Sequence, residues 1–227
     1  MAFRTETKTG ARVIVCLGLA LAAVAQTRTY AVHDGILRID ADSISFEARG
    51  KHAKRSRIWK YDDIQQLVLG PDTLRIVSYE DERWRFGRDR VWRFDHVPAD
   101  LARDWYPVFA KTLDQRFVAA LADESVHPDW QLPAKLLHGR SGSQGELLFS
   151  PTIIVYKSEQ PGESRTWRMT DLRNVATSDP LDLTLTTHER TFRFQLKHTL
   201  PDARFDELWR RINETNGLQI LSKGEMK

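Results

Sequence analysis

The chain has 227 residues, with 34 Lys and Arg against 31 Asp and Glu, a formal net charge of +3 and a single cysteine. This length accommodates one or two domains of ordinary size, and an aromatic content of 10% argues against a disordered chain. One cysteine excludes a disulfide framework and a cysteine-rich zinc site.

The N-terminus has the pattern of a secretory signal peptide. Residues 1–12 carry three cations and one acid, and the uninterrupted apolar run 13–25 ends in Ala-Val-Ala. These features predict a signal peptide over residues 1–25 and an exported protein, periplasmic or extracellular. As a helix the apolar run spans only about 20 Å, less than the hydrocarbon core of a bilayer. An uncleaved signal that anchors the protein in the membrane is the alternative.

Removal of this segment changes the composition of the remaining chain. The cysteine, Cys16, lies inside it, so residues 26–227 contain no thiol for catalysis. Most of the net positive charge also leaves with it, so the exported chain is close to neutral. We therefore expect no nucleic-acid partner.

One pattern of residues occurs twice. Residues 56–64, S-R-I-W-K-Y-D-D-I, match residues 164–172, S-R-T-W-R-M-T-D-L, at Ser, Arg, Trp and Asp. The apolar positions on both sides of these segments also correspond. Such self-similarity indicates a tandem duplication of one structural unit.

The first copy shows strand-like alternation followed by helical spacing. Apolar residues alternate in four short segments, as in half-buried strands: 37–39, 44–46, 74–76 and 92–94. Turns are expected at Gly50, Gly70-Pro71 and Gly87. After Pro98, a helical apolar spacing begins at Leu101 and continues through Phe117 to Leu121. Pro107 should kink this helix or begin a new segment.

The second copy repeats this order. Alternating segments occur at 154–156, 183–185 and 192–194, and a helix is expected after Pro201. Its apolar face consists of Phe205, Leu208, Trp209 and Ile212. The glycine-rich residues 139–145 are expected to form a flexible loop.

The order of strands, the R-x-W-x-x-x-D-[IL] signature, further strands and an amphipathic helix is similar to bacterial PH-like and GRAM-type domains. The resemblance implies a helix-capped barrel that binds lipids, peptides or other domains and performs no catalysis. We predict a mainly β (α+β) fold of two tandem PH-like small β-barrels or sandwiches, each capped by a C-terminal amphipathic helix. The units are expected at 26–121 and 132–216, with a linker at 122–131 and a loosely ordered tail at 217–227.

A basic cluster lies at a predicted hairpin tip in the first copy and consists of Arg49, Lys51, Lys54, Arg55 and Arg57. In PH domains a similar spacing grips phosphorylated inositol headgroups, which Lys51, Arg55 and Arg57 would imitate. Clustered cations also attract anionic lipid surfaces. The alternative is a solvated hairpin tip, because the second copy is acidic in this place.

A second cationic segment, residues 83–94, alternates arginines with Trp84, Phe86, Trp92 and Phe94. This composition could stack single-stranded nucleic acid. A hairpin with its aromatic residues turned inward and its arginine stems covering apolar surface is the preferred interpretation.

The four repeated residues of the signature are interpreted as structural. The indoles of Trp59 and Trp167 should anchor the two cores, and the carboxylates of Asp63 and Asp171 should cap the turns that follow. A residue present in both copies is more easily explained by the fold than by a functional site.

Catalytic motifs are absent from the sequence. The histidines show no zinc-ligand spacing, and no nucleophile elbow or phosphate-binding loop occurs. We predict no catalytic residue, no metal and no cofactor. The leading hypothesis is an exported, non-enzymatic binding or structural module that docks another envelope protein. The alternatives are binding to an anionic membrane surface through Arg49–Arg57 and an unrecognised hydrolase.

Overall fold

A computed structural model describes residues 27–50, 55–82, 85–139 and 141–217. The predicted signal peptide, Lys51, Lys54, Trp84 and residues 218–227 of the predicted tail lie outside the described residues.

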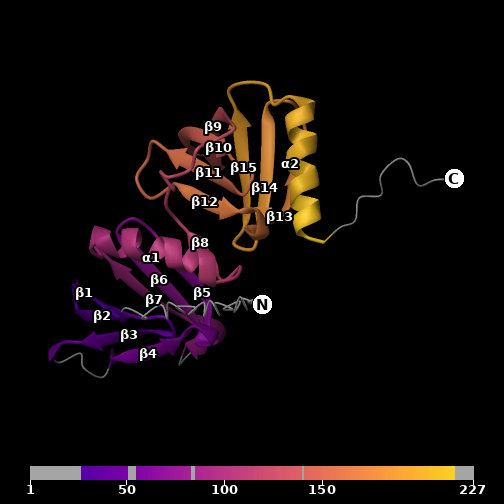
Figure 1. Ribbon diagram of the computed structural model, residues 1–227. Coiled ribbons are helices and arrows are strands. Elements are labelled where there is room, and N and C mark those ends of the chain that lie inside the picture. Colours follow the sequence, from indigo (N-terminus) through magenta and orange to yellow (C-terminus); the bar gives the residue numbers. More distant parts are fainter. Residues whose placement is uncertain (1–26, 51–54, 83–84, 140, 218–227) are drawn as a thin grey trace, which may run out of the picture.

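The same order of elements occurs twice in the chain (Figure 1). We call the elements from β1 to α1 the first unit. They are β1 (Arg28–Val32), β2 (Gly35–Ile39), β3 (Ser43–Ala48), β4 (Arg57–Lys60), the short 3-10 helix η2 (Tyr61–Asp63), β5 (Ile64–Leu69), β6 (Thr73–Glu82), β7 (Arg85–Asp95) and α1 (Ala99–Thr112).

The elements from β9 to α2 form the second unit. They are β9 (Trp130–His138), β10 (Ser141–Phe149), β11 (Ile153–Ser158), β12 (Arg165–Arg168), the 3-10 helix η3 (Met169–Asp171), β13 (Leu172–Ala176), β14 (Asp182–Thr187), β15 (Thr191–Leu196) and α2 (Asp202–Thr215).

A three-residue strand, β8 (Phe117–Ala119), lies between the units. It pairs parallel with β5 and antiparallel with β12. The result is one eleven-stranded sheet, in the order β13-β14-β15-β9-β10-β11-β12-β8-β5-β6-β7, and a separate four-stranded sheet, β1-β2-β3-β4. The fold is therefore mainly β, as predicted, and its sheets form sandwiches rather than closed barrels.

Alternation along the strands builds a separate hydrophobic core in each unit. Trp59 and Trp167 occupy corresponding places, 3% and 4% exposed, each edge-on to a neighbouring aromatic ring. The repeated serines also make the same bond. Ser56 Oγ accepts from the Ala48 amide at 3.0 Å, and Ser164 Oγ accepts from the Ser158 amide at 3.1 Å.

Both helices begin directly after the expected prolines, at Ala99 and Asp202, but their buried faces are narrower than predicted. In α2, Leu208 and Ile212 are buried, whereas Trp209 is 42% exposed. Pro107 lies inside the continuous helix α1.

The first helix is also shorter than predicted. It ends at Thr112, and Phe117 lies on β8 rather than on a continued helical face. Apolar residues four positions apart fit a helix, but here a turn at Asp114, where the Phe117 amide donates to the Asp114 carbonyl at 3.1 Å, starts a strand. The sequence period alone could not show this change.

The structure contradicts two predictions about glycines, the flexible loop at residues 139–145 and the turn at Gly87. Residues 141–145 belong to strand β10 rather than to a flexible loop, and Gly87 lies within β7 rather than at a turn. Gly145 allows β10 and β11 to approach each other closely, because a Cβ there would lie 2.3 Å from the Lys157 carbonyl oxygen. Nearby, Ser143 is fully buried, and its carbonyl accepts from the Tyr156 hydroxyl at 2.6 Å.

Candidate functional site

The two units differ in the length of their first hairpin. Gly35 pairs with Val32 in the first unit, and the corresponding Gly145 pairs with Ala134 in the second. In the first unit the chain turns immediately at residues 33–34, so β1 ends at Val32. In the second unit the hairpin continues for four more pairs, to His138 and Ser141. The second unit therefore has an additional hairpin arm.

In the second unit, strand β9 joins the two sheets along one side. Strand β9 pairs with β15 through three consecutive residue pairs: Ala134 with Leu196, Lys135 with Gln195, and Leu136 with Phe194. Among the described residues, the first unit has no equivalent of this pairing, because β1 is an edge of the small sheet and β7 is an edge of the large one. With the shorter first hairpin, no described strand pairs with these edges of β1 and β7.

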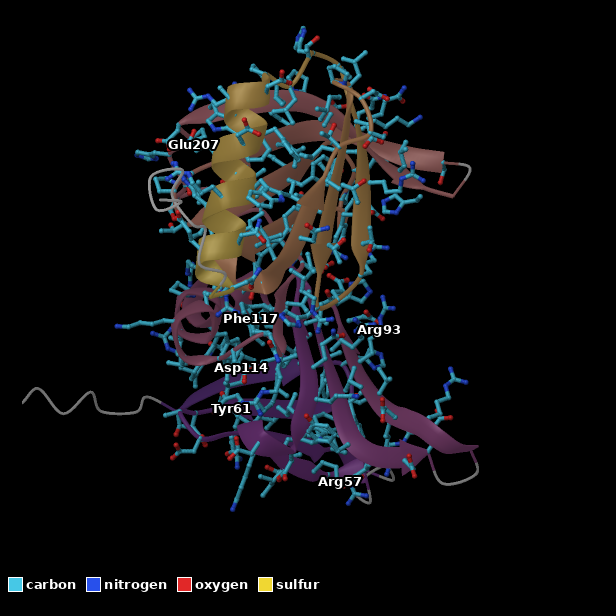
Figure 2. All side chains as sticks on the ribbon, turned by 90° about the vertical axis from the view of Figure 1, so that its right-hand side faces the viewer. Arg57, Tyr61, Arg93, Asp114, Phe117 and Glu207 are labelled. Carbon is cyan, nitrogen blue, oxygen red and sulfur yellow. The ribbon has the colours of Figure 1, made fainter. Side chains whose placement is uncertain are left out.

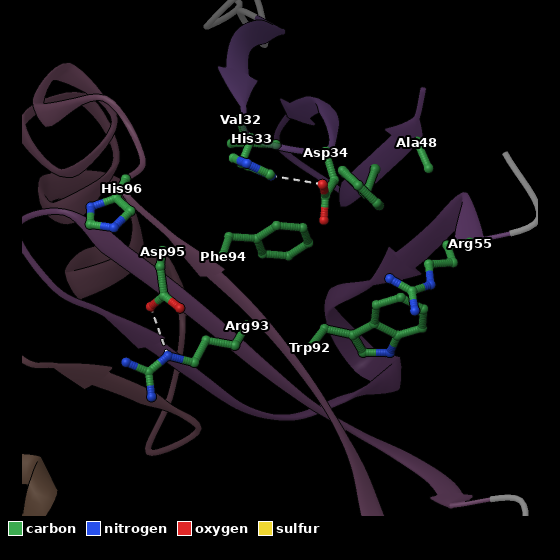
Figure 3. Close-up of a pocket in the computed structure, with 11 residues that line it drawn as sticks. Val32, His33, Asp34, Ala48, Arg55, Trp92, Arg93, Phe94, Asp95 and His96 are labelled. Carbon is green, nitrogen blue, oxygen red and sulfur yellow. Dashed lines mark hydrogen bonds and ion pairs between the residues drawn. The ribbon is translucent and has the colours of Figure 1, made fainter. Parts of the chain in front are cut away.

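A cavity of about 350 Å³ lies at this opening (Figure 3). We call it the β1–β7 gap. Its apolar lining is Val32, Phe46, Ala48, Trp92 and Phe94, and its charged or polar lining is His33, Asp34, Arg55, Arg93, Asp95 and His96. The site thus combines an aromatic floor with a rim of both charge signs.

Packing with the core fixes the aromatic floor. The Phe46 and Phe94 rings meet edge-on with centroids 5.0 Å apart, and Trp92 meets the buried Trp59 at 5.3 Å. Aromatic pairs in this geometry restrict ring rotation and add to core stability. The floor is preformed by the fold of the first unit.

Polar contacts between residues close in the sequence hold most of the rim side chains. Arg93 Nε donates to Asp95 Oδ1 at 2.7 Å, and this bond raises the pKa of the Arg93 guanidinium above its ordinary value. His33 Nδ1 lies 2.8 Å from Asp34 Oδ1. His96 adopts a left-handed backbone with φ of 57°, uncommon for a residue other than glycine. It ends the regular course of β7 before the chain enters α1.

The described members of the predicted basic cluster, Arg49, Arg55 and Arg57, do not converge on one cavity. Arg49, Arg55 and Arg57 are exposed, and none of them joins an ion pair between described residues. Arg55 lines the β1–β7 gap, whereas Arg57 lines a separate hollow of about 550 Å³ beside Ile58. Figure 2 shows Arg57 at the end of the first unit that lies away from the second unit.

The predicted arginine–aromatic hairpin has a different construction. Strand β7 runs as one strand from Arg85 to Asp95 and pairs with β6, so the hairpin is formed by β6 and β7 together. Phe94 is buried, while Trp92 is partly buried against the core. The guanidinium of Arg90 lies 4.7 Å from the Trp92 ring centroid and also pairs with Glu80. Arg88, Arg90 and Arg93 of this strand are thus paired with acidic residues of the same chain.

The repeated aspartates behave differently in the two units. Asp171 Oδ2 accepts from the Arg168 amide at 2.8 Å, which fastens η3. No side-chain bond of this kind caps η2, so the described part of the chain shows the expected aspartate cap in one copy.

Arg168 connects the units, a role that sequence reasoning missed. Its guanidinium donates to the carbonyls of Ala110 at 2.8 Å, Leu113 at 2.6 Å and Asp114 at 2.8 Å, at the C-terminal end of α1. Asp171 holds the same guanidinium from the other side, at 2.7 Å. The final carbonyls of a helix lack intrahelical partners and favour cations. The matching residue of the first unit is Lys60, which is exposed.

A second large cavity, of about 570 Å³, lies at the junction of the units. Its lining includes Pro107 of α1, Ile153 of β11, Met169 of η3 and Arg211 of α2. The described residues contain no group of three His, Cys, Asp or Glu that could hold a metal ion. Within the same residues no helix is long and apolar enough to cross a membrane.

No protein-family model and no curated protein matches this chain. Among solved structures, it is similar to the C-terminal domain of an unknown protein from Leishmania infantum, at 12% identity and a TM-score of 0.33, over 50% of this chain and 95% of that one. It is also similar to the N-terminal PH domain of human ARAP2, at 16% identity and a TM-score of 0.34, over 45% of this chain and 98% of that one.

A third similar structure is the linker-DH/PH region of p115-RhoGEF, at 12% identity and a TM-score of 0.28. That match covers 42% of this chain and 30% of the other. PH domains thus occur among the structural neighbours, each matched by about half of this chain. Likenesses of this size carry no argument about ligands.

Proposed function

We propose that this chain is an exported, non-enzymatic binding module that docks another protein of the cell envelope, and that the β1–β7 gap is its docking site. The observation that carries this proposal is the contrast between the units. Both build a core of the same design, yet only the second closes its two sheets on each other through β9 and β15. In the described part of the first unit, two strand edges without a neighbouring strand and an aromatic cavity lie in the same place.

The test is crosslinking and affinity capture of the full chain in its native envelope, with two matched variants. Ala48→Phe adds a ring inside the gap, where Ala48 lies, whereas Thr191→Phe adds the same ring at an exposed position of β15. We expect the wild type and Thr191→Phe to retain one specific partner, and Ala48→Phe to lose it under conditions in which all three chains are folded. Recovery of no specific partner by the wild type, or equal capture by both variants, would contradict it.

A second candidate function is binding to an anionic membrane surface through the basic hairpin. It is favoured by one observation: Arg49, Arg55 and Arg57 are exposed and take part in no ion pair between described residues. Cations near an anionic surface each contribute about 1 kcal/mol. Vesicles containing anionic lipid should then bind the wild type in a salt-sensitive manner and bind Arg55→Glu more weakly. Equal binding of both proteins excludes this function.

A further inference from the structure

We infer that the partner enters the β1–β7 gap as an extended segment and adds to the free edge of β7 as a further β-strand. This inference rests on the proposed docking function and specifies the form of the partner. The second unit supplies the model for it, because there the extra hairpin arm of β9 occupies the corresponding edge of β15. The partner segment would replace the arm that the first unit lacks.

The second unit also shows which backbone groups face this edge. The Leu196 amide donates to the Leu181 carbonyl next to β14, at 2.8 Å, whereas the Lys197 amide donates to the Pro133 carbonyl next to β9, at 2.9 Å. Backbone groups therefore alternate between the two neighbours, residue by residue. Phe94 corresponds to Phe194 in the repeat, so Arg93 and Asp95 direct their N–H and C=O groups towards the open edge of β7.

The edge of β7 is regular where the partner would pair. From Arg90 to Asp95 every residue has one partner on β6, and the register shifts lie nearer the hairpin tip, beyond Ser78. Open regular edges readily accept an additional strand unless a bulge, a proline or a covering element blocks them. No proline occurs between residues 85 and 95. The edge is thus suited to strand addition.

Side chains define the chemistry of the partner. In the second unit alternate residues of β9 turn into the core: Ala134, whose place Val32 takes in the first unit, is 0% exposed, and Leu136 of the arm is 1% exposed, whereas Lys135 turns outward. The corresponding inward positions in the first unit would contact the aromatic floor formed by Phe46 and Phe94. We therefore expect an extended segment with apolar residues at alternate positions.

The first experiment uses this chain's own arm as the probe. A fluorescent peptide of residues 132–138, L-P-A-K-L-L-H, is titrated into the full chain and followed by fluorescence polarisation, with a scrambled peptide as control. Arg93→Pro removes an amide from the open edge, a change that edge strands tolerate, while Arg93→Ala removes only the side chain. Saturable binding of the peptide to the wild type and to Arg93→Ala is expected, with affinity lowered about tenfold or more in Arg93→Pro.

The second experiment tests the register by disulfide trapping. Lys135 pairs with Gln195, the counterpart of Asp95. A peptide with cysteine at the Lys135 position should therefore crosslink to a Cys16→Ser, Asp95→Cys chain, since directly paired residues lie within disulfide range. The same peptide should not crosslink to a Cys16→Ser, Thr191→Cys chain, whose cysteine is exposed on β15 of the closed second unit.

The outcomes separate this inference from the proposed function. No peptide binding, equal binding to Arg93→Pro and Arg93→Ala, or equal crosslinking at Asp95 and Thr191 overturns strand addition. If Ala48→Phe still abolishes capture of a partner in that case, docking at the gap stands and only the extended form of the partner is wrong. Variants are compared only at matched thermal midpoints, and a destabilised Arg93→Pro chain is replaced by Asp95→Pro against Asp95→Ala.

Discussion

Substitution of Arg168 should weaken the junction between the units more than any exposed change. Arg168→Ala removes the donors to three carbonyls at the end of α1 and the partner of Asp171. The arginine side chain is 19% exposed and that of Asp171 is 15% exposed, so water replaces these bonds only in part. The effect follows from the number of groups that one guanidinium satisfies.

The number of these bonds sets the expected loss in the free energy of unfolding. A hydrogen bond contributes about 1 kcal/mol net, so three carbonyls and one carboxylate amount to about 4 kcal/mol. Water reaching the helix end lowers the loss to about 3 kcal/mol. For a chain of this length, that corresponds to a fall of about 6–12 °C in the midpoint of thermal unfolding. Arg168→Lys keeps the charge but not the planar fork, so it should lose about half as much.

The assay is reversible chemical and thermal denaturation of the full chain, with Lys60→Ala as the matched control. Lys60 holds the same place in the first unit and is exposed, so its removal should change the free energy of unfolding by less than about 0.5 kcal/mol. If the free energies of unfolding of Arg168→Ala and Lys60→Ala lie within about 1 kcal/mol of each other, Arg168 does not hold the units together.

Three further predictions concern the second unit. Trp167→Ala should destabilise it by about 3–5 kcal/mol in denaturant titrations, because the indole is 4% exposed, while exposed Trp209→Ala should cost far less. Gly145→Ala should cost about 2 kcal/mol in the same titrations, because its Cβ would lie 2.3 Å from the Lys157 carbonyl oxygen. Burial and a neighbouring arginine lower the pKa of His188 in the folded chain. As the pH falls, His188 is therefore protonated at a higher pH in the unfolded chain than in the folded chain. Stability should therefore decrease from about pH 7 to pH 5, and His188→Gln should reduce that decrease.

Each of these predictions has a result that contradicts it. An unchanged thermal midpoint in Trp167→Ala would show that the indole does not anchor the core. A Gly145→Ala chain as stable as the wild type would mean that β10 and β11 can separate without cost. A pH dependence identical in the wild type and in His188→Gln would assign the acid sensitivity to other groups.

Much of the fold follows from local patterns in the sequence. Alternation at residues 37–39, 74–76 and 192–194 correctly indicated strands, because one face of each strand is buried and the period of two appears directly. The prolines correctly placed the beginnings of both helices. These features depend on residues close together in the chain.

Features that depend on distant contacts were not predictable in this way. Nothing near Phe117 shows that β5 and β12 lie on either side of it, and the three carbonyls that Arg168 contacts lie more than 50 residues away. The β1–β7 gap did leave a signal in the sequence. Gly145 lies six residues after Gly139 at the turn of its hairpin, whereas Gly35 directly follows the turn at residues 33–34, so the first hairpin of the second copy is longer.

Strand β8 has a consequence for work with fragments of this protein. Thr166 of β12 pairs with Ala119, and its hydroxyl donates to the Leu121 carbonyl at 2.8 Å. A fragment that begins at residue 122 would lose this cover and expose β12 as a bare edge, which favours self-association and poor solubility. A fragment that begins at Asp114 would carry its own protection. The second unit is therefore best expressed with the strand that precedes it.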